Sequence, residues 1–73
     1  MEIHEAMTIC FKNDIKVYPV IENQHSLRLE VNYKGKIKKG TQIFNVKNEQ
    51  KELQEKSKEL YLIIAKKIQD QQQ

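Results

Sequence analysis

The stretch SLRLEVNYKGKIKK, residues 26–39, contains the strongest secondary-structure signal of the chain. Its first seven residues alternate apolar and polar side chains, so that Leu27, Leu29 and Val31 share one side of an extended backbone. This alternation predicts a half-buried β-strand in a sheet that is covered on one face only. Gly35 follows in a short polar stretch and supplies the left-handed residue that a hairpin turn requires. The stretch therefore predicts an antiparallel β-hairpin.

The register of this hairpin depends on the length of its turn. A two-residue turn would pair Asn32 with Ile37, which mixes a polar with an apolar side chain. A three-residue loop over residues 33–35 instead pairs Val31 with Ile37 and Asn32 with Lys36. Because directly paired residues lie on the same side of a sheet, we expect the three-residue loop.

The segments before this hairpin also alternate with a period of two. Ile15 and Val17 share one side of the nearer segment, and the apolar side chains of the more distant one are Met7, Ile9 and Phe11. Polar turns over residues 12–14 and 22–25 would join these segments to the hairpin. We therefore expect an antiparallel meander of three or four strands.

Pro19 and Gly40 mark irregularities of the expected sheet. Proline cannot donate a backbone hydrogen bond, so we expect the first strand to stop pairing near Tyr18 and to leave Pro19 on an open edge. A three-stranded sheet with a loose first strand and a sheet of four full strands both fit this expectation. Gly40 predicts a β-bulge, because the inward-facing side chains change parity between Ile37 and Phe44.

The remaining chain contains neither glycine nor proline and predicts one helix over residues 47–69. Asn45 or Asn48 can cap its N-terminus. One apolar stripe should cover the sheet, formed by Leu53, Ser57, Leu60, Tyr61, Ile64, Ala65 and Ile68. The expected fold class is α+β, an antiparallel meander of three or four β-strands packed on one C-terminal α-helix. A single domain then spans residues 1–73, with a frayed start at 1–5, a sheet region at 7–46 and a polar tail at 70–73.

The composition describes one small domain with a polar surface. The chain has 73 residues, of which 38% are hydrophobic and 32% are charged, and its mean hydropathy is −0.76. Its longest apolar run, residues 60–65, is far shorter than the ~20 residues that cross a bilayer. We find no secretory leader, and a lone cysteine, Cys10, fits a reducing compartment. We therefore expect a cytoplasmic protein that does not contact membranes.

The sequence offers few groups for catalysis or metal binding. Two histidines and one cysteine are too few for a structural zinc site. Cys10 would need His4 or His25 beside it, and no positive helix end is expected there to lower the pKa of its thiol. A glycine-rich phosphate loop is also missing. We expect a protein that is not an enzyme and that uses no cofactor, metal or small-molecule ligand.

Basic residues gather in the hairpin, and the chain has a net charge of +3 and an isoelectric point near 9.0. In the expected register, Lys36 and Lys38 lie on the outer face of the sheet beside Arg28. Such a face can contact the phosphates of nucleic acid, and it can also simply keep the sheet solvated. The predicted nucleic-acid-binding residues are Lys16, Tyr18, Arg28, Lys34, Lys36 and Lys38.

The sequence LRLEVNYKGK at residues 27–36, followed by GTQI at residues 40–43, resembles the arm-type DNA-binding domains of phage and transposon integrases. In the order of elements, the resemblance spans residues 15–65. It implies a three-stranded antiparallel sheet whose face enters the DNA major groove, followed by a C-terminal helix. The DNA contacts that it implies are Arg28, Lys36 and Lys38. The bias of the whole chain toward Lys, Ile, Asn and Gln fits an AT-rich bacterial or mobile-element genome.

The alternative function is interaction with protein. Leu62 falls on the polar side of the expected helix, with Ile63 beside it, and these two residues form a candidate partner interface. The open sheet edge near Pro19 offers a second route, by strand addition. Because a chain of this size buries a small core, a homodimer is as reasonable an expectation as contact with another protein.

Overall fold

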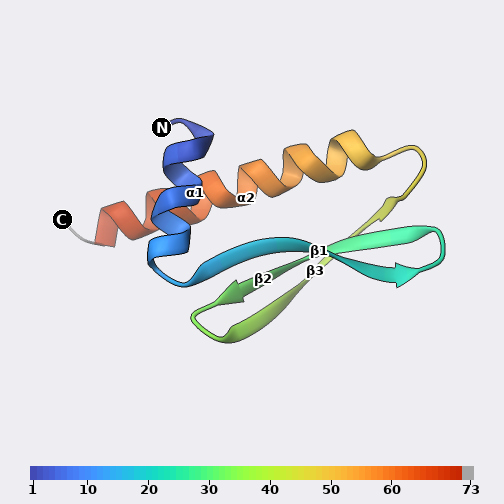
Figure 1. The fold of residues 1–73 in the computed structure, drawn as a ribbon, viewed down its shortest axis with the longest axis horizontal. Coiled ribbons are helices and arrows are strands. Elements are labelled where there is room, and N and C mark those ends of the chain that lie inside the picture. Colours follow the sequence, from blue (N-terminus) through green and yellow to red (C-terminus); the bar gives the residue numbers. More distant parts are fainter. Residues whose placement is uncertain (72–73) are drawn as a thin grey trace.

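A computed structural model describes residues 1–71 of the chain. It contains a three-stranded antiparallel sheet in the order β1-β2-β3 and a long C-terminal helix, which confirms the predicted α+β arrangement (Figure 1). An additional helix precedes the sheet and begins inside the stretch that the sequence predicts to be frayed. The elements are α1 (Ile3–Lys12), β1 (Ile15–Asn23), β2 (Ser26–Tyr33), β3 (Lys36–Asn45) and α2 (Gln50–Gln71).

Helix α1 replaces the strand that the sequence predicts over residues 7–11, so this prediction is wrong. It followed the period-two spacing of Met7, Ile9 and Phe11. The side chains that α1 buries completely are instead Ala6 and Cys10, which are four residues apart and lie on one side of a helix. Phe11 remains 48% exposed, and its ring packs nearly perpendicular to that of Tyr61, with 5.7 Å between the ring centres. The packing of α1 on α2 thus overrides the local alternation.

The turn between β2 and β3 has two residues, so the predicted three-residue loop is also wrong. Asn32 pairs with Ile37, and Lys34 and Gly35 form the turn with φ angles of 53° and 91°. Two left-handed residues match the twist of the flanking strands, and the Asn32 side chain accepts a 2.9 Å hydrogen bond from the backbone N–H of Gly35. Ile37 lies on a sheet face that no helix covers and is 57% exposed. Turn geometry therefore decides the register here, and the matching of side chains does not.

Strand β1 is an edge strand, and it pairs with β2 along nearly its whole length. Pro19 lies opposite Leu29, so the expectation that pairing stops near Tyr18 is wrong. The expected edge position of Pro19 is confirmed, because β2 is the only neighbour of β1 in the sheet. An edge strand accepts proline where the missing N–H would point away from the sheet.

The predicted bulge at Gly40 is confirmed. The register of β2 against β3 shifts between the pairs Glu30–Lys39 and Arg28–Ile43. A Cβ atom at Gly40 would lie 2.7 Å from the carbonyl oxygen of Leu29, a distance that side chains do not adopt. Glycine therefore lets the bulged strand approach β2 closely.

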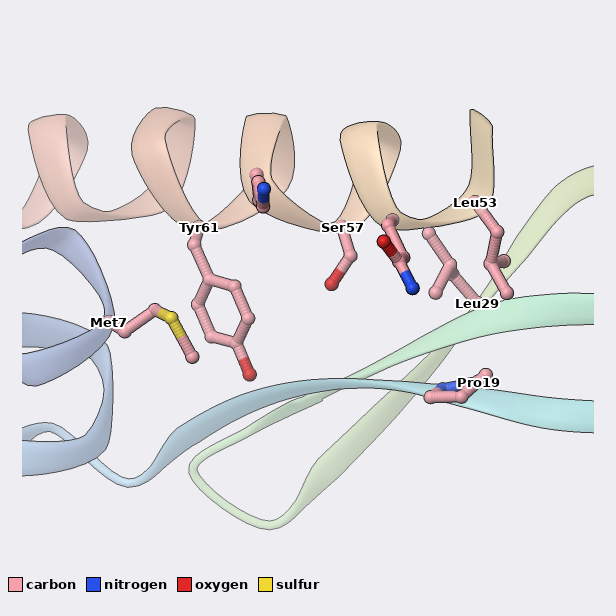
Figure 2. A pocket seen from close by; sticks show the side chains of 8 residues that line it. Met7, Pro19, Leu29, Leu53, Ser57 and Tyr61 are labelled. Atoms are coloured by element: carbon pink, nitrogen blue, oxygen red, sulfur yellow. The ribbon is translucent and has the colours of Figure 1, made fainter. Parts of the chain in front are cut away.

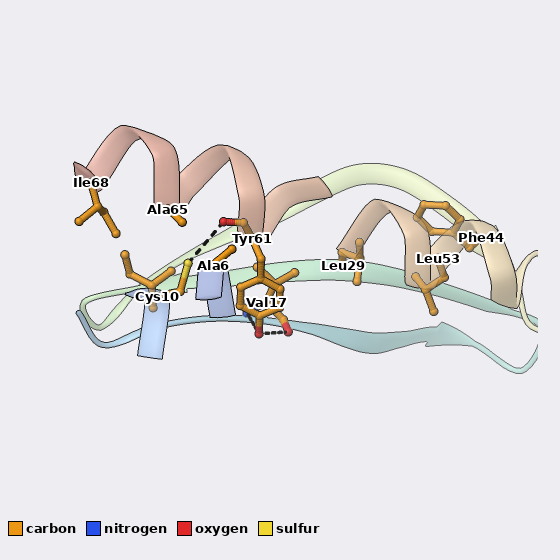
Figure 3. Packing of buried hydrophobic residues seen from close by; sticks show 10 residues of the cluster. Ala6, Cys10, Val17, Leu29, Phe44, Leu53, Tyr61, Ala65 and Ile68 are labelled. Atoms are coloured by element: carbon orange, nitrogen blue, oxygen red, sulfur yellow. Dashed lines mark hydrogen bonds between the residues drawn. The ribbon is translucent and has the colours of Figure 1, made fainter. Parts of the chain in front are cut away.

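One hydrophobic core joins the two helices to the inner face of the sheet (Figure 3). Tyr61 lies at its centre, and its hydroxyl donates to the carbonyl oxygen of Val17 at 3.0 Å and accepts from the N–H of Val17 at 2.9 Å. On the edge of β1 that faces away from β2, the hydroxyl thus supplies the two hydrogen bonds to Val17 that a neighbouring strand would otherwise supply. The predicted stripe of α2 is confirmed, with Leu53, Ala65 and Ile68 also buried.

Candidate nucleic-acid interface

The structure divides the six predicted contact residues between the two faces of the sheet. The expectation that Lys36 and Lys38 lie beside Arg28 is wrong, because the two-residue turn reverses the side on which they lie. In the observed register Lys38 pairs with Val31 on the inner, helix-covered face. Lys34 lies in the turn itself. The outer face holds the three remaining residues, Lys16, Tyr18 and Arg28.

On the outer face, Lys16 and Lys39 form no ion pair with residues 1–71, whereas Arg28 is paired. Arg28 forms an ion pair with Glu22, with 2.9 Å between the guanidinium nitrogen and the carboxylate oxygen. Both side chains are partly buried, and the Nε atom of Arg28 is buried without a hydrogen-bond partner among the described residues. Ile37 and Ile43, which are 57% and 52% exposed, lie on the same face. A phosphate would therefore have to compete with Glu22 for Arg28.

Tyr18 and Glu30 form a second polar contact on the outer face. The Tyr18 hydroxyl donates a 3.1 Å hydrogen bond to Glu30, whose side chain is 8% exposed. Partial desolvation, followed by this hydrogen bond and the charge of Glu30, raises the pKa of Tyr18 above its usual value of 10.0. Lys39 pairs with Glu30 from β3 and is the lysine that the observed register adds to this face.

Four lysines lie together along the other edge of the sheet. Strand β3 is an edge strand, and its first eight residues are exposed. Among residues 1–71 the ion pairs are Arg28–Glu22 and Lys56–Glu59, so none of these edge lysines forms one with the described residues. We call this cluster the basic edge, formed by Lys34, Lys36, Lys38 and Lys39.

The charge of the chain is unevenly distributed along the sequence. Residues 31–48 contain five lysines and no acidic residue, whereas the rest of the chain has eight basic and ten acidic residues. The segment that forms the hairpin and β3 therefore carries a charge of +5, and the remainder carries −2. The positive field of the molecule originates in this segment.

An apolar cavity of about 250 Å³ opens beside the other edge strand, β1 (Figure 2). Its walls include Met7 of α1, Pro19 of β1 and Leu53 and Tyr61 of α2. Ile21, two residues beyond Pro19, is 76% exposed. From Pro19 to Ile21, past the point where the Tyr61 hydroxyl contacts β1, this strand therefore presents an open apolar edge.

The predicted partner interface on α2 is partly covered within the chain. Leu62 is partly buried against the hydrophobic core and lines a hollow together with Met1, so this side chain has neighbours within the chain. Ile63 is 44% exposed.

The single cysteine is buried inside the fold. The Cys10 thiol donates a 3.6 Å hydrogen bond to the backbone carbonyl of Tyr61, and burial raises the pKa of the thiol above 9.0. Among residues 1–71, no three His, Cys, Asp or Glu side chains come together as ligands for a metal ion.

No protein-family model, curated protein or solved structure matches the chain. None of the helices described between residues 1 and 71 is long and apolar enough to span a membrane.

Lys39 is absent from the residues that the sequence predicts as nucleic-acid contacts. The expected three-residue loop placed Lys39 on the inner face of the sheet, and the observed two-residue turn places it on the outer face. The absence of acidic residues between 31 and 48 was visible in the sequence and marks the basic edge directly.

Proposed function

We propose that this protein binds nucleic acid through the basic edge. The observation that carries the proposal is the run of lysines on an exposed edge strand, in a segment without acidic residues and without ion pairs to residues 1–71. Unpaired cations on an exposed strand attract phosphates, and they gain free energy by releasing the counterions of the nucleic acid. The outer face, where Arg28 is paired with Glu22, takes a smaller part than the sequence predicts.

The arrangement of the basic edge suits a phosphate backbone. Lys36 and Lys38 project from the inner side of β3, and Lys39 projects from the outer side. The turn adds Lys34 at the tip. The strand part of the cluster, from Lys36 to Lys39, spans about 10 Å at ~3.3 Å per residue, which corresponds to about three base pairs at ~3.4 Å per pair. A strand edge with cations on both sides can approach a backbone without help from the helices.

The proposal is tested by fluorescence anisotropy with labelled duplex and single-stranded oligonucleotides at several salt concentrations. Four phosphate contacts predict a log–log salt slope of about −4 for a duplex and about −3 for a single strand. The test variant combines Lys34→Asn, Lys36→Gln, Lys38→Gln and Lys39→Gln. Asn is used at position 34 because it tolerates the left-handed backbone of the turn.

The matched control neutralises four lysines elsewhere, on α2, at positions 51, 56, 58 and 66. Both variants have the same net charge, so only the placement of the removed charges differs. We expect the basic-edge variant to lose binding and the α2 variant to retain most of it. Equal losses in the two variants would show that net charge alone attracts the nucleic acid, and the assignment to the basic edge would be wrong.

We further propose that the protein has no catalytic activity of its own. The buried, protonated Cys10 lacks the electropositive, accessible setting of a nucleophilic thiol. An activity lost on Cys10→Ala, in a variant that still folds, would contradict this proposal.

A second candidate function is association with another copy through β1. The observation that favours it is the exposed Ile21 next to the apolar cavity bounded by Pro19. Self-pairing of β3 would bring like charges together, whereas the β1 edge has no such run of lysines. Sedimentation over a range of concentrations tests this candidate with Ile21→Gln, which would weaken a dimer formed at β1 and, because it changes no charge, leave nucleic-acid binding unchanged.

A further inference from the structure

A hollow of about 210 Å³ lies between the inner side of the β2–β3 hairpin and the last turns of α2. Its floor is apolar and is formed by Val31, Ile64 and Ile68. Its rim carries two lysines from opposite walls, Lys38 on β3 and Lys67 on α2. Among residues 1–71, no acidic side chain lines the hollow. The hollow therefore combines an apolar floor with a rim of positive charge.

This combination restricts the chemistry of an occupant. A purely apolar molecule would bring no negative charge to Lys38 and Lys67, and a small inorganic anion would leave the apolar floor uncovered. A planar, weakly polar body attached to phosphate satisfies both parts, because its faces cover the floor while its phosphates lie between the lysines. A nucleotide unit has this construction.

Tyr33 supplies an aromatic side chain at the same hollow. It ends β2, next to the turn, and the Nζ atom of Lys34 lies 5.8 Å from the centre of its ring. Bases stack on tyrosine rings in many single-strand-binding proteins, and lysines beside the ring contact the adjoining phosphates. Gln71 adds an amide that can donate to and accept from the edge of a base.

The hollow is continuous with the basic edge, because Lys38 belongs to both. A nucleic-acid strand bound at Lys38 therefore lies next to the hollow. In a duplex the bases are paired and stacked, and one of them would enter only after being flipped out at a cost in free energy. Bases of a single strand are free to enter.

We propose that the hollow is a subsite for one base of a single-stranded nucleic acid, which stacks on Tyr33 while Lys38 and Lys67 contact the flanking phosphates. This inference rests on the proposed function, since the basic edge provides most of the affinity. It adds that a base contributes to binding and that single strands are preferred over duplexes.

The test compares a labelled 12-nucleotide thymidine oligomer with an abasic oligomer of the same length and charge. We expect the wild-type protein to bind the thymidine oligomer about ten-fold more tightly, the scale of one base stacked on an aromatic side chain. Tyr33→Leu keeps an apolar side chain at the hollow but removes the ring, and it should reduce this ratio to about one. The matched control is Tyr18→Leu on the outer face, which should leave the ratio unchanged. Thermal unfolding followed by circular dichroism verifies that each variant folds.

A second measurement reads out the contact directly. The chain has three tyrosines and no tryptophan, so stacking of a base on Tyr33 should quench part of the tyrosine fluorescence. Tyr33→Phe should keep the ten-fold ratio and lose most of that quenching, because phenylalanine stacks but emits weakly.

The outcomes separate this inference from the proposed function. If both oligomers bind equally to the wild-type protein and the basic-edge variant binds neither, the proposed function stands and the base subsite is wrong. A ratio that falls with Tyr18→Leu but not with Tyr33→Leu would place the base on the outer face and overturn the inference. Absence of binding by the wild-type protein at low salt overturns both proposals.

Discussion

The hydroxyl of Tyr61 closes the edge of β1, and its removal is the sharpest test of how the helices hold the sheet. Tyr61→Phe leaves the ring in the core and deletes one oxygen atom. That oxygen accepts the N–H of Val17 at 2.9 Å and donates to the carbonyl oxygen of Val17 at 3.0 Å. Tyr61 is 5% exposed and Val17 is 7% exposed, so water does not readily replace the lost partner.

The expected cost follows from the two backbone groups that lose their partner. A buried polar group without a hydrogen bond costs about 1–3 kcal/mol. Two such groups lose their partner, but the variant no longer has to transfer a hydroxyl group from water into the core, which offsets part of the cost. We therefore expect the free energy of unfolding to fall by about 2 kcal/mol. For a chain of this length, that loss corresponds to a decrease in Tm of about 10 °C.

Urea and thermal denaturation followed by circular dichroism measure this change. The control is Tyr33→Phe, because no hydrogen bond of the Tyr33 hydroxyl is found among residues 1–71, and we expect its stability to stay within about 0.5 kcal/mol of wild type. If Tyr61→Phe were no less stable than Tyr33→Phe, the hydroxyl would not be closing the strand edge and the reasoning would be refuted.

Three further predictions follow from particular contacts. Gly40→Ala should lower the free energy of unfolding by about 1–3 kcal/mol in urea denaturation, because the added Cβ would lie 2.7 Å from the carbonyl oxygen of Leu29. A loss under about 0.5 kcal/mol would contradict this close approach. Glu30→Gln should lower the pKa of Tyr18 toward 10.0 in a tyrosinate absorbance titration. The fold favours protonated Tyr18, so the stability that this contact contributes is present at neutral pH and is lost as the pH rises above 10.0 through the raised pKa. An unchanged tyrosinate titration in the Glu30→Gln variant would exclude Glu30 as a cause of the raised pKa. Cys10 should react with a thiol reagent far more slowly in the native protein than in urea at pH 7, since it is buried and its pKa is raised, and equal rates would show that α1 does not cover it.

The sheet and α2 could be predicted because their signals extend over many residues. The alternation through Leu27, Leu29 and Val31 and the stripe from Leu53 to Ile68 each depend on burial against a large surface, so a local irregularity does not erase them. The irregularity at Gly40 was predicted at the right place but for a wrong reason, because Ile37 faces outward and the parity of the inward side chains is the same at Lys38 and Phe44.

Helix α1 was not predictable from the same pattern. Its apolar residues satisfy both a period of two and a spacing of four, and the choice between them is made by α2, which Ala6 and Cys10 contact as buried side chains. Ala6 and Cys10 are smaller than Met7, Ile9 and Phe11, so the larger side chains dominated the apolar pattern. Short apolar segments are ambiguous for this reason.

The candidate site was predicted in part. The lysine-rich hairpin was identified, but the face on which each lysine lies depends on whether the turn has two or three residues. A one-residue change in register moves every side chain of the strand to the other side. The left-handed backbone at Lys34 decides this register, and lysine has no sequence preference that reveals it.

The most direct test of the account is to map the bound surface by NMR. Amide chemical shifts of the full chain are recorded while a short single-stranded oligonucleotide is added at low salt. We predict that the perturbed amides cluster in residues 33–39 and in the last turns of α2, from about Ile64 onward, while the amides around Lys16 and Arg28 change little. Perturbations centred on Lys16, Tyr18 and Arg28, or an unchanged spectrum, would contradict the claim that the basic edge is the nucleic-acid interface.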